Sequence, residues 1–268
     1  MRKKPIFLIL VFLLFAFISG CGSEGNIHSS PEPSKTELNE VIDRHGQVEN
    51  LERLDTFVEK VQANSKDQIR LIRYTIEGDP IYHDLDFDGS TLTFTHDSTE
   101  DQYGNGEVTS YQCKSLSKQE SDTETKYVIE GCSNGLEGEL LSIAHDVEKE
   151  DYFAFQLNYG VNKENQIDTK EQVLTKQLHN GETMTISDFQ MSTEQMNRIY
   201  KQMVYANYLQ PKSLSTTCKE NSYGSFELNV WINSATKSFE WTSCDQSEDG
   251  REMTALVEQI ISIAEEKL

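Results

Sequence analysis

The sequence has few basic residues, with 24 Lys and Arg against 45 Asp and Glu and a net charge of −21 at pH 7. Proteins that bind nucleic acid need a basic footprint for the phosphates, so this balance argues against that class. The same sign argues against a protein that lies flat on anionic lipid. The acidity instead predicts a solvated, self-repelling surface that keeps the chain soluble.

Familiar catalytic motifs are also missing. The sequence contains no His-Glu-x-x-His, no Gly-x-Ser-x-Gly, no phosphate-binding loop and no Gly-x-Gly-x-x-Gly. Ser115 and Lys118, like Ser234 and Lys237, have the Ser-x-x-Lys spacing of penicillin-recognising enzymes, but both pairs fall in predicted hairpins and the companion motifs do not occur. We therefore predict no catalytic residue and no cofactor.

No two of the five cysteines have the Cys-x-x-Cys spacing, which leaves zinc binding and thioredoxin-like redox chemistry without support. Outside the cytoplasm, the four cysteines after Cys21 would form disulfides, with three possible connectivities. A hairpin centred between residues 122 and 123 places Cys113 directly opposite Cys132, which predicts that pair. Cys218 and Cys244 flank the last predicted hairpin, and we predict that they form the second disulfide, a pairing that register does not fix.

The apolar run from Ile6 to Phe17 is shorter than the roughly 20 residues of a transmembrane helix, and it follows a short basic start. The next four residues, Ile18-Ser19-Gly20-Cys21, resemble the lipobox of bacterial lipoproteins. This resemblance implies that residues 1–20 are a cleaved signal peptide and that acyl chains such as palmitate on Cys21 anchor the protein to the outer face of the cell membrane. Cleavage would leave 21 basic and 45 acidic residues, a net charge of −24.

Residues 21–37 consist largely of Gly, Ser, Pro and Glu, which predicts a flexible tether. A helix is expected from Leu51 onward, with Asn50 as its N-cap, because apolar residues recur at helical spacing. Strands are expected over 69–76 and 81–87, followed by a turn at Asp88-Gly89 and a return strand over 92–96. A second hairpin is expected to pair 108–118 with 125–132.

Residues 49–54 (ENLERL) and 69–81 (IRLIRYTIEGDPI) are similar to a domain of unknown function in lipoproteins of low-GC Gram-positive bacteria. The resemblance covers roughly residues 40–135. It supports a lipoprotein of that source. It implies no activity, because no functional residues are assigned to that family.

The second half shows strand alternation over 153–159 and further strand signals over about 170–178 and 183–186. Residues 192–195 (STEQ) form a capping box that starts a helix with an apolar face. A hairpin is expected over 226–233 and 237–242, with Trp231 and Trp241 as core anchors, followed by a helix over 249–267.

The predicted fold class is therefore α+β, with two small domains of antiparallel hairpins packed against amphipathic helices. We place these domains at residues 38–147 and 150–268, with a charged boundary near 147–151. One alternative stays open, because the apolar residues Leu140, Leu141 and Ile143 would fuse the halves if they formed a strand shared with the second half.

The spacing Asp84-x-Asp86-x-Asp88-Gly89 matches the first half of a calcium-binding loop. The twelfth position is Thr95, where such a loop needs a bidentate Glu, and the flanks have strand patterns. We therefore predict a hairpin and no metal site. His83 is interpreted as a satisfied sheet histidine.

The sequence as a whole favours a non-enzymatic, membrane-anchored lipoprotein that binds an unknown protein or cell-envelope partner. Two alternatives are an inhibitor of a secreted enzyme such as a protease, and an envelope hydrolase whose site the sequence does not reveal. An exposed apolar patch or edge strand would favour binding, whereas a cleft with perturbed carboxylates would favour an enzyme.

Overall fold

The computed structural model describes residues 39–266, apart from residues 136 and 219–222. Within this range the fold is mixed α+β, and strands predominate over three helices. The first half contains, in chain order, β1 (Glu40–Arg44), β2 (Gln47–Glu49), α1 (Leu51–Gln62), β3 (Asp67–Tyr74), β4 (Pro80–Phe87), β5 (Leu92–Asp97), β6 (Val108–Cys113), β7 (Ser115–Glu120), β8 (Glu124–Glu130) and β9 (Gly138–Ala144).

The second half contains, in chain order, the 3₁₀ turn η2 (Val147–Lys149), β10 (Phe153–Gly160), β11 (Asn165–Asp168), β12 (Val173–Gln177), β13 (Thr183–Ser187), α2 (Thr193–Tyr205), β14 (Ser225–Ile232), β15 (Ala235–Thr242) and α3 (Glu248–Glu265). β11 was not expected from the sequence. It is a short strand with little alternation.

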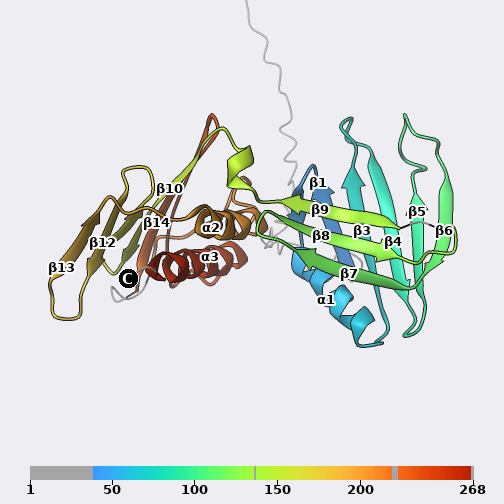
Figure 1. The fold of residues 1–268 in the computed structure, drawn as a ribbon, viewed down its shortest axis with the longest axis horizontal. Coiled ribbons are helices and arrows are strands. Elements are labelled where there is room, and N and C mark those ends of the chain that lie inside the picture. Colours follow the sequence, from blue (N-terminus) through green and yellow to red (C-terminus); the bar gives the residue numbers. More distant parts are fainter. Residues whose placement is uncertain (1–38, 136, 219–222, 267–268) are drawn as a thin grey trace, which may run out of the picture.

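Two sheets and one helix build the first half. Sheet A has the strand order β2-β1-β3-β4-β5-β6, and sheet B has the order β7-β8-β9. Figure 1 shows sheet B and α1 lying over one face of sheet A, and α1 contacts β3 and β7. The shared core includes the fully buried Leu54, Phe57, Leu71 and Tyr127. Full burial of such a side chain contributes roughly 1.5–3 kcal/mol.

The helix α1 begins where the apolar spacing predicts, but Asn50 does not cap it with its side chain. Asn50 has a left-handed backbone, with φ 58° and ψ 38°, and makes no side-chain cap hydrogen bond. Its Nδ2 group donates instead to the Glu40 carbonyl oxygen, at 3.0 Å. This bond ties the start of α1 to β1.

The sequence predicts antiparallel hairpins, but sheet A is a mixed sheet. β1 pairs with β3 in parallel, with Val41 opposite Leu71. β2 and α1 form the crossover between these two strands. The sequence does not predict β1 and β2, because each has five residues or fewer and lacks a sustained alternation of apolar and polar residues.

The expected strand over 108–118 is two strands in different sheets. β6 ends at Cys113 in sheet A, and β7 begins at Ser115 in sheet B. The predicted register is nevertheless confirmed, because Ser115 lies opposite Glu130 and Glu120 lies opposite Thr125. β9, which carries Leu140 and Leu141, pairs with β8 and so belongs to the first half.

Sheet C forms the second half, with the order β13-β12-β11-β10-β14-β15. Figure 1 shows α2 and α3 together on one face of this sheet. The capping box at the start of α2 is confirmed, since the Ser192 side chain accepts from the Gln195 backbone N–H and the Gln195 side chain accepts from the Ser192 N–H. At the start of α3, the Ser247 side chain accepts from the Gly250 N–H, without the reciprocal bond of a capping box.

One of the two tryptophans is not a core anchor. Trp241 is fully buried beneath α3, and its Nε1 donates to the Thr254 hydroxyl at 3.0 Å. Trp231 lies on the other face of sheet C, where it is half-buried and the Lys170 ammonium sits 4.9 Å from its ring centroid. The register explains this difference, because Trp231 alternates with the buried Val230 and Ile232 along β14.

Each half has a separate hydrophobic cluster, and the end of α2 touches both. Val204 packs against both clusters, and Tyr205 packs against the cluster of the first half. Asn207 Nδ2 donates to the Val48 carbonyl oxygen at 2.8 Å. The turn after α2 therefore contacts the first half directly.

Candidate functional site

A cleft of about 290 Å³ lies between sheets A and B, on the side of sheet A away from the Arg70–Asp84 ion pair. Its lining comes from β4, β5 and β6 on one side and from β8, β9 and the loop between them on the other. The lining residues are His83, Phe94, His96, Thr109, Tyr111, Ile129, Asn134, Gly138, Glu139 and Leu140. This size suits one small molecule or one or two side chains.

The hairpin register brings the two histidines of the cleft together. β4 and β5 are joined by a four-residue turn, so that Phe87 lies opposite Leu92 and His83 lies opposite His96. Asp88 holds this turn, because its Oδ1 atom accepts from the backbone N–H groups of Ser90 and Thr91 at 2.8 and 2.9 Å. The turn lies at Asp88-Gly89, as the sequence predicts, and the strands start and end close to the expected bounds of 81–87 and 92–96.

The two imidazoles form a hydrogen-bonded pair, with His83 Nε2 at 3.0 Å from His96 Nδ1. His83 is only 9% exposed. Burial, together with the nearby His96 and Arg73, lowers its pKa to about 4. His83 is therefore neutral at physiological pH, where one ring donates to the other.

The interpretation of His83 as a satisfied histidine is wrong for one of its two nitrogens. Its Nδ1 atom is buried and has no hydrogen-bond partner among the described residues. A buried polar atom without a partner carries a desolvation cost of about 1–3 kcal/mol. This nitrogen is an unsatisfied polar atom of a residue that lines the cleft.

Aromatic and aliphatic side chains surround the histidine pair. The rings of His83 and Phe94 lie 5.4 Å apart in a tilted arrangement, and Leu140 is buried on the facing sheet. Glu139 is the carboxylate of the lining, and it pairs with Lys126 at 3.1 Å near the surface. The cleft thus combines apolar surface with a hydrogen-bonded imidazole pair.

A broader hollow of about 670 Å³ lies at the other face of sheet A, over β1, β3 and β4. Arg70 and Asp84 occupy its floor as a bidentate pair, with distances of 2.6 and 2.8 Å. Arg70 also stacks over the Tyr82 ring at 5.0 Å. Because Arg70 and Asp84 on its floor already satisfy one another, this hollow is the weaker candidate for a site.

The three aspartates of the calcium-like spacing do not converge. Asp84 is held by Arg70 and Asp88 by its turn, while Asp86 is exposed. Within residues 39–266, excluding those not described, no group of three or more His, Cys, Asp or Glu side chains has a metal-binding arrangement. The absence of calcium binding stays a prediction.

The two Ser-x-x-Lys pairs lie in hairpins, as expected. Ser115 and Lys118 are three positions apart on β7, so their side chains point to opposite faces. Lys118 bonds to Asp55 at 3.0 Å, and Lys237 bonds to the Leu209 carbonyl oxygen at 2.6 Å. Each lysine is thus engaged away from the serine of its pair.

Both predicted disulfides are present, Cys113–Cys132 and Cys218–Cys244. The first joins the end of β6 to the loop after β8, where the chain passes from sheet A to sheet B. Two backbone bonds flank it, from Lys114 N–H to the Glu130 oxygen at 3.0 Å and from Ser133 N–H to the Gln112 oxygen at 2.8 Å. This disulfide therefore fixes the corner of the cleft beside β6.

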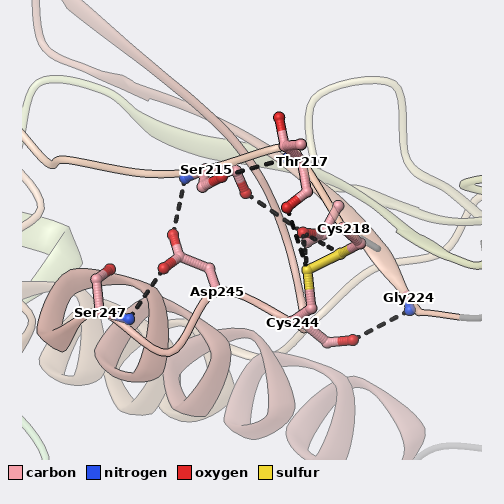
Figure 2. The surroundings of a disulfide bond; sticks show 9 residues. Ser215, Thr217, Cys218, Gly224, Cys244, Asp245 and Ser247 are labelled. Atoms are coloured by element: carbon pink, nitrogen blue, oxygen red, sulfur yellow. Dashed lines mark hydrogen bonds between the residues drawn. A yellow bond between two sulfur atoms is a disulfide. The ribbon is translucent and has the colours of Figure 1, made fainter. Parts of the chain in front are cut away.

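The second disulfide ties the segment before β14 to the end of β15 (Figure 2). The Thr242 hydroxyl lies 3.0 Å from the Cys218 sulfur and 3.1 Å from the Cys244 sulfur. Asp245 next to it accepts from the Ser247 N–H at 3.0 Å and from the Ser215 N–H at 2.7 Å. The Ser247 side chain, followed by these two backbone N–H groups, lowers the pKa of the Asp245 carboxyl. Asp245 thus stabilises the fold around the disulfide.

A second polar cluster, which the sequence did not reveal, lies at the junction of the halves. The Tyr205 hydroxyl donates to Thr125 Oγ1, and Thr125 Oγ1 lies 3.2 Å from His145 Nε2. Glu120 bridges Lys118 at 2.9 Å and Lys201 at 3.2 Å. Thr125 and His145 are fully buried, so this cluster joins the halves and presents no open site.

The proposed lipidation site, Cys21, lies outside the described residues. No described helix is long and apolar enough to cross a membrane. The sequence singled out His83 but not its partner His96, nor Tyr111 and Leu140 on the cleft walls. The signal that could have found the histidine pair is the β4–β5 register, which follows from the number of residues between the two strands.

Residues 38–128 match a family described as a domain of unknown function, DUF4362. The match covers β1 to most of β8, and so includes the sheet A wall of the cleft but not β9. No curated protein matches the chain. No solved structure matches it either.

Proposed function

We propose that the chain is a lipoprotein, anchored through acylated Cys21 at the outer face of a Gram-positive cell membrane, that binds its ligand in the cleft between sheets A and B. The lipobox residues Ile18–Cys21 and the polar stretch over 21–37 support the anchor and the tether. On this proposal residues 38–147 and 150–268 are two domains, each with its own hydrophobic cluster.

The single observation that carries the binding function is a partly apolar cleft lined by the hydrogen-bonded pair of His83 and His96. The Nδ1 atom of His83 has no hydrogen-bond partner among the described residues. Apolar pockets with a few placed polar groups are typical of ligand sites. The cleft walls offer aromatic contact through Phe94 and Tyr111 and a hydrogen-bonding group through the imidazole pair. This chemistry fits reversible recognition of a largely apolar group that carries one polar atom.

A substitution at Gly138 tests this function. Gly138 lines the cleft, and a Cβ atom added there would meet nothing within 4 Å. Gly138→Leu should therefore fill the cleft without a backbone clash, whereas Gly138→Ala should leave most of it open.

The measurement is a screen of small neutral fragments, in which binding is detected by changes in the chemical shifts of amide and imidazole NMR signals. We expect hits that shift the signals of His83, His96 and Leu140, that persist in Gly138→Ala and that vanish in Gly138→Leu. Hits confined to other surfaces, or hits that survive Gly138→Leu, would contradict the proposed site.

A further inference from the structure

The strand β6 is an edge of sheet A, and no described strand lies beyond it. Val108, which begins this strand, is 58% exposed, and Tyr103, in the loop before it, is 79% exposed. An edge strand presents unpaired backbone N–H and C=O groups, which are a template for pairing with another chain. The edge of β6 is therefore a candidate docking surface in its own right.

The free backbone groups of β6 can be assigned from its register. Ser98 N–H donates to the Glu107 oxygen, on the side that faces β5, at 3.0 Å. Alternate residues present their backbone groups to opposite edges, so Thr109 and Tyr111 also bond toward β5. Val108 and Ser110 present theirs to the open edge, while at Gln112 the oxygen is used by Ser133 N–H.

Natural edge strands are protected by charge, proline, bulges or cover. The β6 sequence, VTSYQC, has no charged residue and no proline. Its exposure alternates in the pattern of a regular strand up to Cys113. The backbone of β6 is thus left open for another strand.

This open edge is continuous with the cleft. Thr109 and Tyr111 are on the face of β6 that lines the cleft, and Cys113 on the same face is tied to Cys132. A strand added beside β6 would lie about 4.8 Å away, with every second side chain on that same face. Those side chains would enter the cleft between Tyr111 and Leu140.

Resting on the binding function proposed above, we propose that the ligand is an extended peptide segment of a partner protein, added as a strand along β6 with alternate apolar side chains in the cleft. The loop before β6 carries Glu100, Asp101 and Glu107, and the net charge is −21. Charge complementarity therefore selects a segment with basic residues outside its apolar positions.

The probe is a dodecapeptide selected from a random phage-displayed library on the immobilised, folded chain. Its binding should slow hydrogen exchange of the Ser110 amide by about tenfold or more, because that N–H gains a partner. The amides of Thr109 and Tyr111 should not change, since they already bond to β5. This alternation distinguishes strand addition from simple burial.

Two variants at one position provide the matched control. Ser110→Pro removes the outward N–H at an edge, where proline is tolerated, and should weaken peptide binding by about tenfold or more. Ser110→Ala keeps the N–H and loses the hydroxyl that lies 3.0 Å from Thr95 Oγ1, and should bind within about twofold of the parent. Thermal unfolding checks that both variants are folded.

The outcomes separate the two proposals. Peptide binding that is lost in Gly138→Leu but insensitive to Ser110→Pro, without Ser110 protection, would overturn strand addition and leave the cleft function intact. Ser110 protection that persists in Gly138→Leu would overturn the cleft as the binding site. Failure to enrich any peptide, or a concentration-dependent dimer that protects Ser110 without peptide, would overturn the peptide proposal.

Discussion

The Tyr205 hydroxyl donates a hydrogen bond to the Thr125 hydroxyl across the junction of the two halves, at 2.7 Å. Tyr205 ends α2 in the second half, and Thr125 lies on β8 beside the buried His145. Burial raises the pKa of Tyr205, so the phenol stays protonated and remains a donor. This bond is part of the contact through which α2 touches the first half.

Tyr205→Phe should lower the free energy of unfolding by about 1 kcal/mol, because it removes one hydrogen bond from a buried hydroxyl. The matched control is Tyr82→Phe, which removes an exposed bond to Glu100 at 3.1 Å and should cost no more than about 0.5 kcal/mol. Urea unfolding of both variants measures the difference. Equal effects would mean that the junction bond contributes no more than a surface contact.

Residues 36–147 and 150–268, expressed separately in an oxidising compartment, should each fold, because each contains its own hydrophobic cluster and disulfide. Dispersed amide spectra from both fragments are expected. Signals of Val204 and Tyr205 should differ from those of the full chain, since their first-half partners are absent. An unfolded spectrum of either fragment that is rescued by adding the other would show one intertwined domain.

The low pKa of His83 makes stability depend on pH in a defined window. The folded-state pKa is about 4 and the ordinary value is 6.5, so the unfolded chain binds more protons between these values. The contribution of neutral His83 to the free energy of unfolding is therefore complete above pH 6.5. As the pH falls toward 4 this contribution is lost, and the free energy of unfolding drops by up to about 3 kcal/mol. Burial is the first cause, as a charged imidazole would lose its hydration.

His83→Phe removes this titration while keeping a ring in the cleft. The free energy of unfolding of the parent and of this variant is measured from pH 7 to pH 4. As the pH falls, the parent should lose more stability than the variant. The carboxylates titrate in both proteins and largely cancel. A difference that does not change with pH would contradict the assigned neutral, buried state.

Cys21→Ala should release the protein from the membrane or leave an unprocessed precursor, because acyl chains on Cys21 are the proposed anchor. Two acyl chains give stable anchoring, whereas one is marginal. Detergent-phase partitioning of the parent and the variant, each from whole cells, measures the effect. Partitioning that is unchanged in the variant would rule out lipidation at this residue.

Much of the fold can be predicted from local pattern. The apolar spacing of Leu51, Leu54 and Phe57 and the capping box at Ser192 each identified a helix, because these signals depend on residues within one or two turns. The symmetry of Cys113 and Cys132 about one turn identified a disulfide. In each case the information is local, or depends on one correctly placed turn.

The features that escaped prediction depend on which strands pair, on their register and on which face of a strand packs against the core. The parallel pairing of β1 with β3 requires a crossover that the short β1 does not signal. Trp231 is as apolar as Trp241, yet it faces outward because of strand parity. The His83–His96 pair follows from a four-residue turn that Asp88 stabilises, where the Asp-Gly sequence favours a two-residue turn.

The most direct test of the cleft as the binding site is photocrosslinking in intact bacterial cells that carry the anchored chain. A p-benzoylphenylalanine side chain is placed at position 111 in the cleft or, as the control, at position 82 on the opposite face of sheet A. We predict a discrete adduct from position 111 that disappears in the Gly138→Leu background, and none from position 82. Equal adducts from both positions, or an adduct that survives Gly138→Leu, would contradict the cleft as the binding site.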